Sequence, residues 1–151
     1  MSTDTFTPGY GAVRSVDVSF DDLDPQHMLY HGRYPALVDR AILGYWAGKG
    51  IRYDADGSLG DTVQVVRDLG VTFAVPVRRF GPVLVHFWVS HIGTTSMRYD
   101  FRLLAEDGTT LHAQGHRTMV NLGPGTGRPA PWSSRARANY AALQQPADRP
   151  A

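Results

Sequence analysis

The fold of this chain is decided by the stretch Tyr34-Pro-Ala-Leu-Val-Asp-Arg-Ala-Ile-Leu-Gly-Tyr-Trp46. Its apolar side chains recur at the i, i+3, i+4, i+7 spacing that places them on one face of an α-helix. Pro35 falls in the first turn, where its missing N–H costs nothing, and Gly48 and Gly50 supply a stop. The stretch therefore predicts one long helix that buries an apolar face, with Gly44 permitting a strand to approach it closely.

Strand patterns surround this helix on both sides. Residues 13–20 alternate before it, with Val16, Val18 and Phe20 on one face. Four more strands are predicted from alternation over residues 69–75, 83–89, 97–103 and 111–122, and Glu-Asp-Gly at 106–108 marks a hairpin. We therefore predict an α+β fold in which about five antiparallel strands wrap around one central helix.

The chain has 151 residues, 42% of them apolar, which suits one domain with a sizeable core. Residues 11–132 are predicted to form that domain. Residues 1–10 are expected to be a flexible N-terminus, and residues 133–151 a short C-terminal helix followed by a loosely attached tail.

Composition excludes several classes of function. Fifteen Lys and Arg against fourteen Asp and Glu are scattered along the chain, which argues against nucleic acid as a partner. The absence of cysteine rules out disulfides, thiolate metal sites and a cysteine nucleophile. The first residues lack the pattern of a signal peptide, and no apolar run reaches the ~18–20 residues that span a bilayer. We expect a cytoplasmic protein without membrane association.

The residues that carry chemistry lie just before the helix, in Asp24-Pro-Gln-His-Met-Leu-Tyr-His31-Gly-Arg-Tyr34. Asp24 is ionised at neutral pH, and free N–H groups at a helix start can polarise a carbonyl. This combination suits attack on an acyl group. The neighbouring Asp21 and Asp22 are expected to be solvated turn residues.

The order of segments around this stretch resembles that of the hot-dog-fold acyl-CoA thioesterases. A strand and an acidic loop are followed by Asp24, then by Leu29-Tyr30-His31, Tyr34 and the step Asp39-Arg40-Ala41. The resemblance is to the 4-hydroxybenzoyl-CoA thioesterase class and its Tol-Pal-associated relatives. It covers about residues 13–132, because Val66-Arg67, Ala74-Val-Pro-Val77, Gly93-Thr-Thr-Ser-Met97 and Arg128-Pro129 also fall where that class has similar elements.

The resemblance implies that Asp24 is the catalytic carboxylate, either as nucleophile on the thioester carbonyl or as general base on water. His31 would contribute its ring to the site and its backbone N–H as an oxyanion donor. Tyr30 and Tyr34 would line the site, although both also suit the helix core. The substrate would be an acyl-CoA or acyl-carrier-protein thioester, hydrolysed without cofactor or metal.

Two positions depart from the pattern of that class. The turn after Asp24 usually has small residues, often ending in glycine, but here it is Pro25-Gln26-His27. A side chain at His27 is expected to require an ordinary φ and to narrow the acyl pocket or add a polar contact. Phe20 stands where close relatives can carry a tyrosine hydroxyl. Both departures concern the substrate class more than the reaction.

The class builds its site at a two-fold interface, so the resemblance implies a homodimer or homotetramer. Arg78, Arg79 and Arg128 are candidates for binding coenzyme A phosphates, because a guanidinium binds phosphate bidentately. The Gly-rich segment 123–127 lacks the Lys and the helix of a phosphate loop.

Several alternatives compete with this hypothesis. A zinc or iron centre is conceivable, because two groups of residues have the spacing of metal ligands. One group is Asp24, His27 and His31, and the other is His112 and His116 on one strand face. A Ser-His-Asp hydrolase is disfavoured because no Gly-x-Ser-x-Gly elbow occurs. A hot-dog hydratase or dehydratase, and an acyl-CoA-binding protein without turnover, remain as alternatives to a thioesterase.

Overall fold

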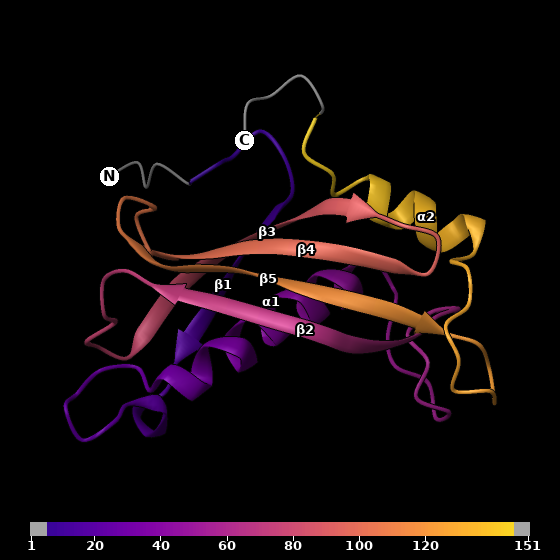
Figure 1. The fold of residues 1–151 in the computed structure, drawn as a ribbon. Helices are drawn as coiled ribbons and strands as arrows, with labels where there is room; N and C mark the ends of the chain where they lie inside the picture. Colours follow the sequence, from indigo (N-terminus) through magenta and orange to yellow (C-terminus); the bar gives the residue numbers. More distant parts are fainter. Residues whose placement is uncertain (1–5, 147–151) are drawn as a thin grey trace.

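The structure is a computed structural model that describes residues 6–146 (Figure 1). Two 3-10 helices precede the long helix, η1 (Phe20–Asp22) and η2 (His31–Arg33), and η2 runs directly into α1. The regular elements are β1 (Ala12–Val18), α1 (Tyr34–Gly48), β2 (Val63–Phe73), β3 (Gly81–Ile92), β4 (Ser96–Ala105), β5 (Leu111–Leu122) and α2 (Ser134–Ala141). None of the helices within residues 6–146 is long and apolar enough to cross a membrane.

One antiparallel sheet of five strands, in the order β1-β3-β4-β5-β2, packs with its concave inner face against α1 (Figure 1). The predicted α+β fold is thereby confirmed. At Gly44 the close neighbour is a side chain, since a Cβ there would lie 3.2 Å from a guanidinium nitrogen of Arg14 in β1. The core joins the apolar face of α1 to inner-face residues of β3, β4 and β5, among them Leu37, Ala41, Trp46, Phe87, Tyr99 and Phe101.

The acidic loop after β1 differs from its prediction in two residues. Phe20 was assigned to the first strand, on the same face as Val16 and Val18, but β1 ends at Val18 and Phe20 is 80% exposed in η1. Asp22 was expected to be solvated, but it is buried. Its carboxylate accepts a hydrogen bond from the Ser19 N–H at 2.8 Å and lies 3.8 Å from Arg33 Nε, so it ties the loop to the start of the helix.

Strand β2 begins six residues before the alternation that predicted it. A bulge between Val66 and Asp68 shifts the register against β5, so apolar and polar residues no longer alternate through the strand. On the inner face of this edge strand, Val66, Leu69 and Phe73 are 51%, 43% and 51% exposed. An edge strand with this much uncovered apolar surface is a template for pairing with another chain.

Both ends of the described chain attach to the domain. Phe6 and Tyr10 lie against His86 on the outer face of the sheet, with ring centroids 5.9 and 5.1 Å from the imidazole. Burial lowers the pKa of His86 to about 4, and its Nδ1 accepts a hydrogen bond from Arg102 Nε. At the other end, Leu143 is buried and its carbonyl accepts from the Val89 N–H at 3.0 Å, so the predicted C-terminal helix is anchored beyond its last turn.

Candidate active site

A tight turn over residues 22–30 positions the acidic candidate. Its two arms are joined by hydrogen bonds from the Tyr30 N–H to the Asp22 carbonyl at 3.0 Å and from the Asp24 N–H to the Met28 carbonyl at 2.7 Å. Between them, Leu23 and Leu29 form an isolated antiparallel bridge. The turn therefore sets Asp24 on one arm and delivers the other arm directly to η2 and the start of α1.

The carboxylate of Asp24 has two oxygens with different surroundings. Oδ1 accepts hydrogen bonds from the backbone N–H groups of Gln26 at 2.8 Å and Met28 at 3.2 Å. Among the described residues, none donates to Oδ2. The side chain is thus oriented through one oxygen, and the other oxygen is available to a substrate or a water molecule.

The conformation of His27 corrects the sequence-based expectation. Its φ is +59°, whereas we expected an ordinary negative value because the residue carries a side chain. The turn needs this left-handed geometry so that the Met28 N–H reaches Asp24 Oδ1. His is among the few non-glycine types that occupy this region with some frequency. His27 thus fills the position of the glycine that the resemblance leads one to expect, and its side chain is exposed.

The free energy of unfolding of variants at residue 27 tests whether the turn holds this positive φ. We expect His27→Val to lower the free energy of unfolding by about 1–2 kcal/mol, because a β-branched residue is poorly tolerated at positive φ. His27→Asn should leave it within about 0.5 kcal/mol of wild type. Urea denaturation of the three proteins provides the measurement. A His27→Val protein as stable as His27→Asn would show that the turn does not hold this conformation in solution.

The start of the helix presents backbone N–H groups beside this turn. The hydrogen bonds of the turn use the N–H groups of Tyr30 and Arg33 but not that of His31. The imidazole of His31 is exposed and lies against the ring of Tyr30 at a tilt of 48°, with 4.3 Å between ring centroids. Because η2 continues into α1, the free N–H groups of the combined helix lie at its positive end.

The segment between β2 and β3 closes the other side of the turn. The Leu29 N–H donates to the Val77 carbonyl at 2.7 Å, and Tyr34 packs edge-on against Phe73 at 4.9 Å between centroids. Burial raises the pKa of Tyr34, while a hydrogen bond with the Val77 backbone offsets part of that rise. Tyr34 therefore supports the site as a buried neutral phenol.

The three candidate phosphate-binding arginines divide into two groups. Arg78 and Arg79 are exposed and directly follow Val77, so they lie beside the turn that holds Asp24. Arg128 is exposed in the segment after β5, where Leu122 faces Val63 at the opposite end of β2. Within the chain, Arg78 and Arg79 thus adjoin the turn that carries Asp24, and Arg128 lies toward the opposite end of β2.

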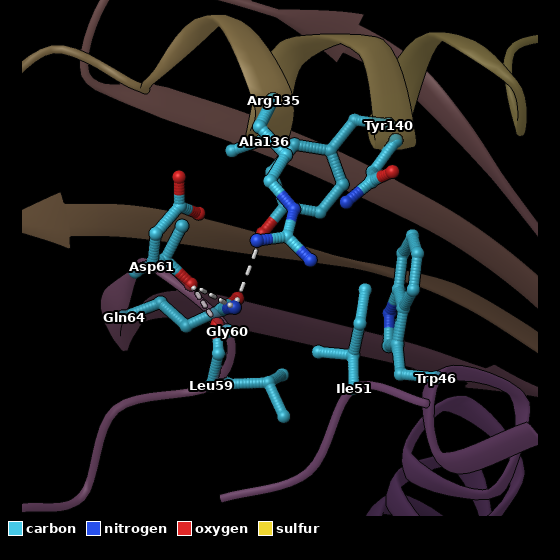
Figure 2. Close-up of a pocket in the computed structure, with 11 residues that line it drawn as sticks. Trp46, Ile51, Leu59, Gly60, Asp61, Gln64, Arg135, Ala136 and Tyr140 are labelled. Atoms are coloured by element: carbon cyan, nitrogen blue, oxygen red, sulfur yellow. Dashed lines mark hydrogen bonds between the residues drawn. The ribbon is translucent and has the colours of Figure 1, made fainter. Parts of the chain in front are cut away.

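Two cavities adjoin the helix, one near its C-terminal end and one along its length from Asp39 to Trp46. The first, of about 20 Å³, lies between α2, the segment before β2 and Trp46, and Gln64 Nε2 donates across it to Tyr140 Oη at 3.1 Å (Figure 2). It has room for about one water molecule. The second, of about 180 Å³, lies between α1 and the inner face of the sheet; its lining includes Asp39, Trp46, Gln64, Tyr99 and Arg117.

Sequence reasoning missed the ion pair in the larger cavity. Arg117 of β5 has a side chain that is 9% exposed, and its Nη1 is paired with Asp39 Oδ1 of α1. A signal was present, because Arg117 interrupts the small and apolar inner-face series Ala113, Gly115 and Met119. The pairing partner could not be read from the sequence, since 78 residues separate the two side chains.

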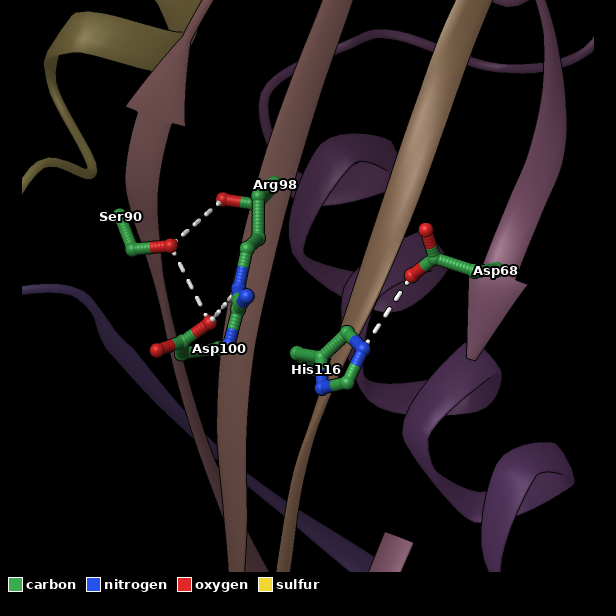
Figure 3. A network of polar contacts seen from close by, with 5 residues as sticks. All are labelled: Asp68, Ser90, Arg98, Asp100 and His116. Atoms are coloured by element: carbon green, nitrogen blue, oxygen red, sulfur yellow. Dashed lines mark hydrogen bonds and ion pairs between the residues drawn. The ribbon is translucent and has the colours of Figure 1, made fainter. Parts of the chain in front are cut away.

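The histidines of β5 do not assemble into a metal site. His116 Nε2 lies 3.2 Å from Asp68 on the outer face of the sheet, near the separate contacts of Ser90, Arg98 and Asp100 (Figure 3). His112 Nδ1 lies 2.8 Å from the Val75 carbonyl. Within residues 6–146, no three His, Cys, Asp or Glu side chains are grouped so that they could hold a metal ion.

Comparison with known proteins identifies the family. A family model described as the thioesterase superfamily matches residues 26–112, which is more than half of the chain. The chain belongs to this superfamily. It is therefore assigned as a thioester hydrolase. The match begins two residues after Asp24, so the role of that carboxylate rests on other grounds.

Solved structures agree with this fold. The PA5185 protein from Pseudomonas aeruginosa strain PAO1 is 23% identical, with TM-score 0.78 over 92% of this chain and 95% of that chain. A thioesterase complexed with coenzyme A and Zn from Thermus thermophilus is 26% identical, with TM-score 0.73 over 96% and 100%. A DHNA-CoA thioesterase from Staphylococcus aureus is 21% identical, with TM-score 0.74 over 87% and 89%. A sequence search of curated proteins found no significant match.

Proposed function

We propose that this thioesterase hydrolyses acyl-CoA thioesters at a site formed by Asp24 and the start of α1. The observation that carries the proposal is the orientation of Asp24, whose Oδ1 is fixed by two backbone N–H groups while Oδ2 remains available. The start of the helix next to it offers N–H groups to a developing oxyanion.

In the proposed reaction, the thioester carbonyl oxygen lies against the His31 N–H and gains charge as the carbonyl carbon is attacked. Asp24 Oδ2 either attacks the carbon directly or removes a proton from the water that does so. In both routes the carbon–sulfur bond breaks, coenzyme A leaves as a thiolate that takes up a proton, and water supplies an oxygen to the products. The ring of His31 and the nearby Tyr30 would contact the substrate, and His27 borders the site from the tip of the turn.

The proposed active unit is a dimer that pairs through the β2 edges. The exposed inner-face side chains of β2 are apolar, as expected of an edge that another copy covers. A two-fold axis between antiparallel β2 strands sets the end of one strand against the beginning of the other. Arg128 of one protomer would then approach Arg78 and Arg79 of the other, giving a basic rim for the phosphates of coenzyme A. Two such dimers could form a tetramer.

Release of free thiol from short, long and aromatic acyl-CoAs tests the function. We expect hydrolysis of at least one series with kcat/KM in the ordinary range of about 10⁴–10⁸ M⁻¹s⁻¹. The same acyl groups on acyl carrier protein show which carrier is preferred. Binding of acyl-CoA without thiol release would indicate a binding protein, and hydration of an enoyl-CoA without thiol release would indicate a hydratase.

A further inference from the structure

The larger cavity is lined by an arginine that has a buried donor without an acceptor. The Nε of Arg117 is buried and makes no hydrogen bond with any described residue, although the same guanidinium pairs with Asp39 through Nη1. An unsatisfied buried donor on a charged group costs free energy, so such groups are rare unless a ligand or water completes them. Arg117, which lines this cavity, thus has a donor that its pair with Asp39 leaves unused.

The walls of the cavity indicate what kind of group fits. Trp46, Tyr53 and Tyr99 supply aromatic surface, and Ile42, Leu43, Val66 and Met119 supply aliphatic surface. Its volume of about 180 Å³ is comparable to the ~150 Å³ that accommodates a benzene molecule. The occupant is therefore a compact apolar group that carries an oxygen acceptor.

The position of the cavity relates it to the Asp24 of a second protomer. Within one chain, Tyr34 touches Phe73 at the end of β2, whereas the cavity contacts Val66 near its beginning. Arg117 itself pairs in register with Leu69, which lies four residues, or about 14 Å at 3.4 Å per residue, from Phe73. In the β2-paired dimer proposed above, the cavity of one protomer lies toward the Asp24 turn of its partner.

We propose that this cavity receives the far end of the acyl group, and that Arg117 selects acyl groups with an oxygen acceptor at that end. The inference rests on the proposed function. Asp39 already neutralises Arg117, so a neutral carbonyl or hydroxyl oxygen suits the pocket better than a second carboxylate. A hydroxyl could both accept from Arg117 and donate to Asp39, whose side chain is half exposed.

Thiol release from octanoyl-CoA, 7-oxooctanoyl-CoA, 8-hydroxyoctanoyl-CoA and suberoyl-CoA tests the inference. The wild type should favour the oxo or hydroxy substrate over octanoyl-CoA by about 100-fold in kcat/KM, because an unmatched buried donor penalises the methyl-ended chain. Arg117→Met should reduce this preference below about 5-fold while retaining hydrolysis of octanoyl-CoA. A preference for suberoyl-CoA alone would overturn the choice of a neutral group.

Matched variants separate this proposal from general damage. Arg98→Met removes an exposed arginine on the outer face of the same sheet and should keep the wild-type preference. Arg117→Lys keeps the charge and should retain part of the preference if Arg117→Met proves unstable in thermal unfolding. Equal rates for all four substrates would mean that Arg117 binds only water. That result would overturn this inference and leave the proposed function standing. No thiol from any substrate, including the wider panel above, would instead count against the proposed function.

Discussion

Replacing Asp24 by asparagine is expected to lower kcat for thiol release by about two to four orders of magnitude. The amide oxygen of the new side chain can still accept from the Gln26 and Met28 N–H groups that now orient Asp24 Oδ1, so the turn should keep its shape. The amide nitrogen replaces Oδ2 and can act neither as nucleophile nor as base. Steady-state rates for the best acyl-CoA, together with thermal unfolding, provide the measurement.

Asp21→Asn is the matched control, because Asp21 is an exposed carboxylate three residues away in the same loop. It should retain the wild-type rate. Full activity of Asp24→Asn would show that the reacting carboxylate lies elsewhere. A single turnover in H₂¹⁸O with excess enzyme distinguishes the two chemical roles, since label found in Asp24 indicates a nucleophile. A general base leaves Asp24 unlabelled, as does a nucleophile whose anhydride is opened by water at the acyl carbon, so only label in Asp24 is decisive.

The fold was predictable from the sequence because its main signals are local. The helical spacing from Tyr34 to Trp46 and the alternation in β3 to β5 both reflect burial of a single face. Where the prediction differed, a local irregularity had interrupted the pattern. The bulge after Val66 hid the first half of β2, and the short helix η1 turned Phe20 into solvent.

The candidate site could be predicted only in part, since its features depend on more than residue type. Asp24 and His31 were singled out because they flank a helix start. The left-handed φ of His27 was not expected, although the resemblance places a glycine at this position. The Asp39–Arg117 pair joins α1 to β5 across the core, and such pairing depends on the tertiary arrangement. Sequence patterns thus led to the residues of the proposed reacting end and missed the cavity that lies along the helix.

Charges placed on the inner face of β2 are expected to dissociate the dimer, and thiol release should be lost along with it. In the proposed dimer, Val66 and Leu69 would lose water on pairing, so Val66→Glu and Leu69→Glu combined would bury unpaired carboxylates. If each substitution, present in both protomers, costs about 2 kcal/mol per dimer, the dimer dissociation constant rises roughly 1,000-fold. Sedimentation should then show a species near 16.6 kDa instead of twice that mass.

Activity in the same samples links the dimer to the reaction. Because acyl groups bound in one protomer's cavity would react at the partner's Asp24, kcat should fall with the fraction of dimer and recover at high protein concentration. Ser15→Glu places the same charge on the opposite edge strand, β1, and should change neither property. A double variant that remains dimeric would exclude the β2 edge as the interface. A monomer with full activity would show that each protomer contains a complete site, and the shared-site arrangement would then be wrong.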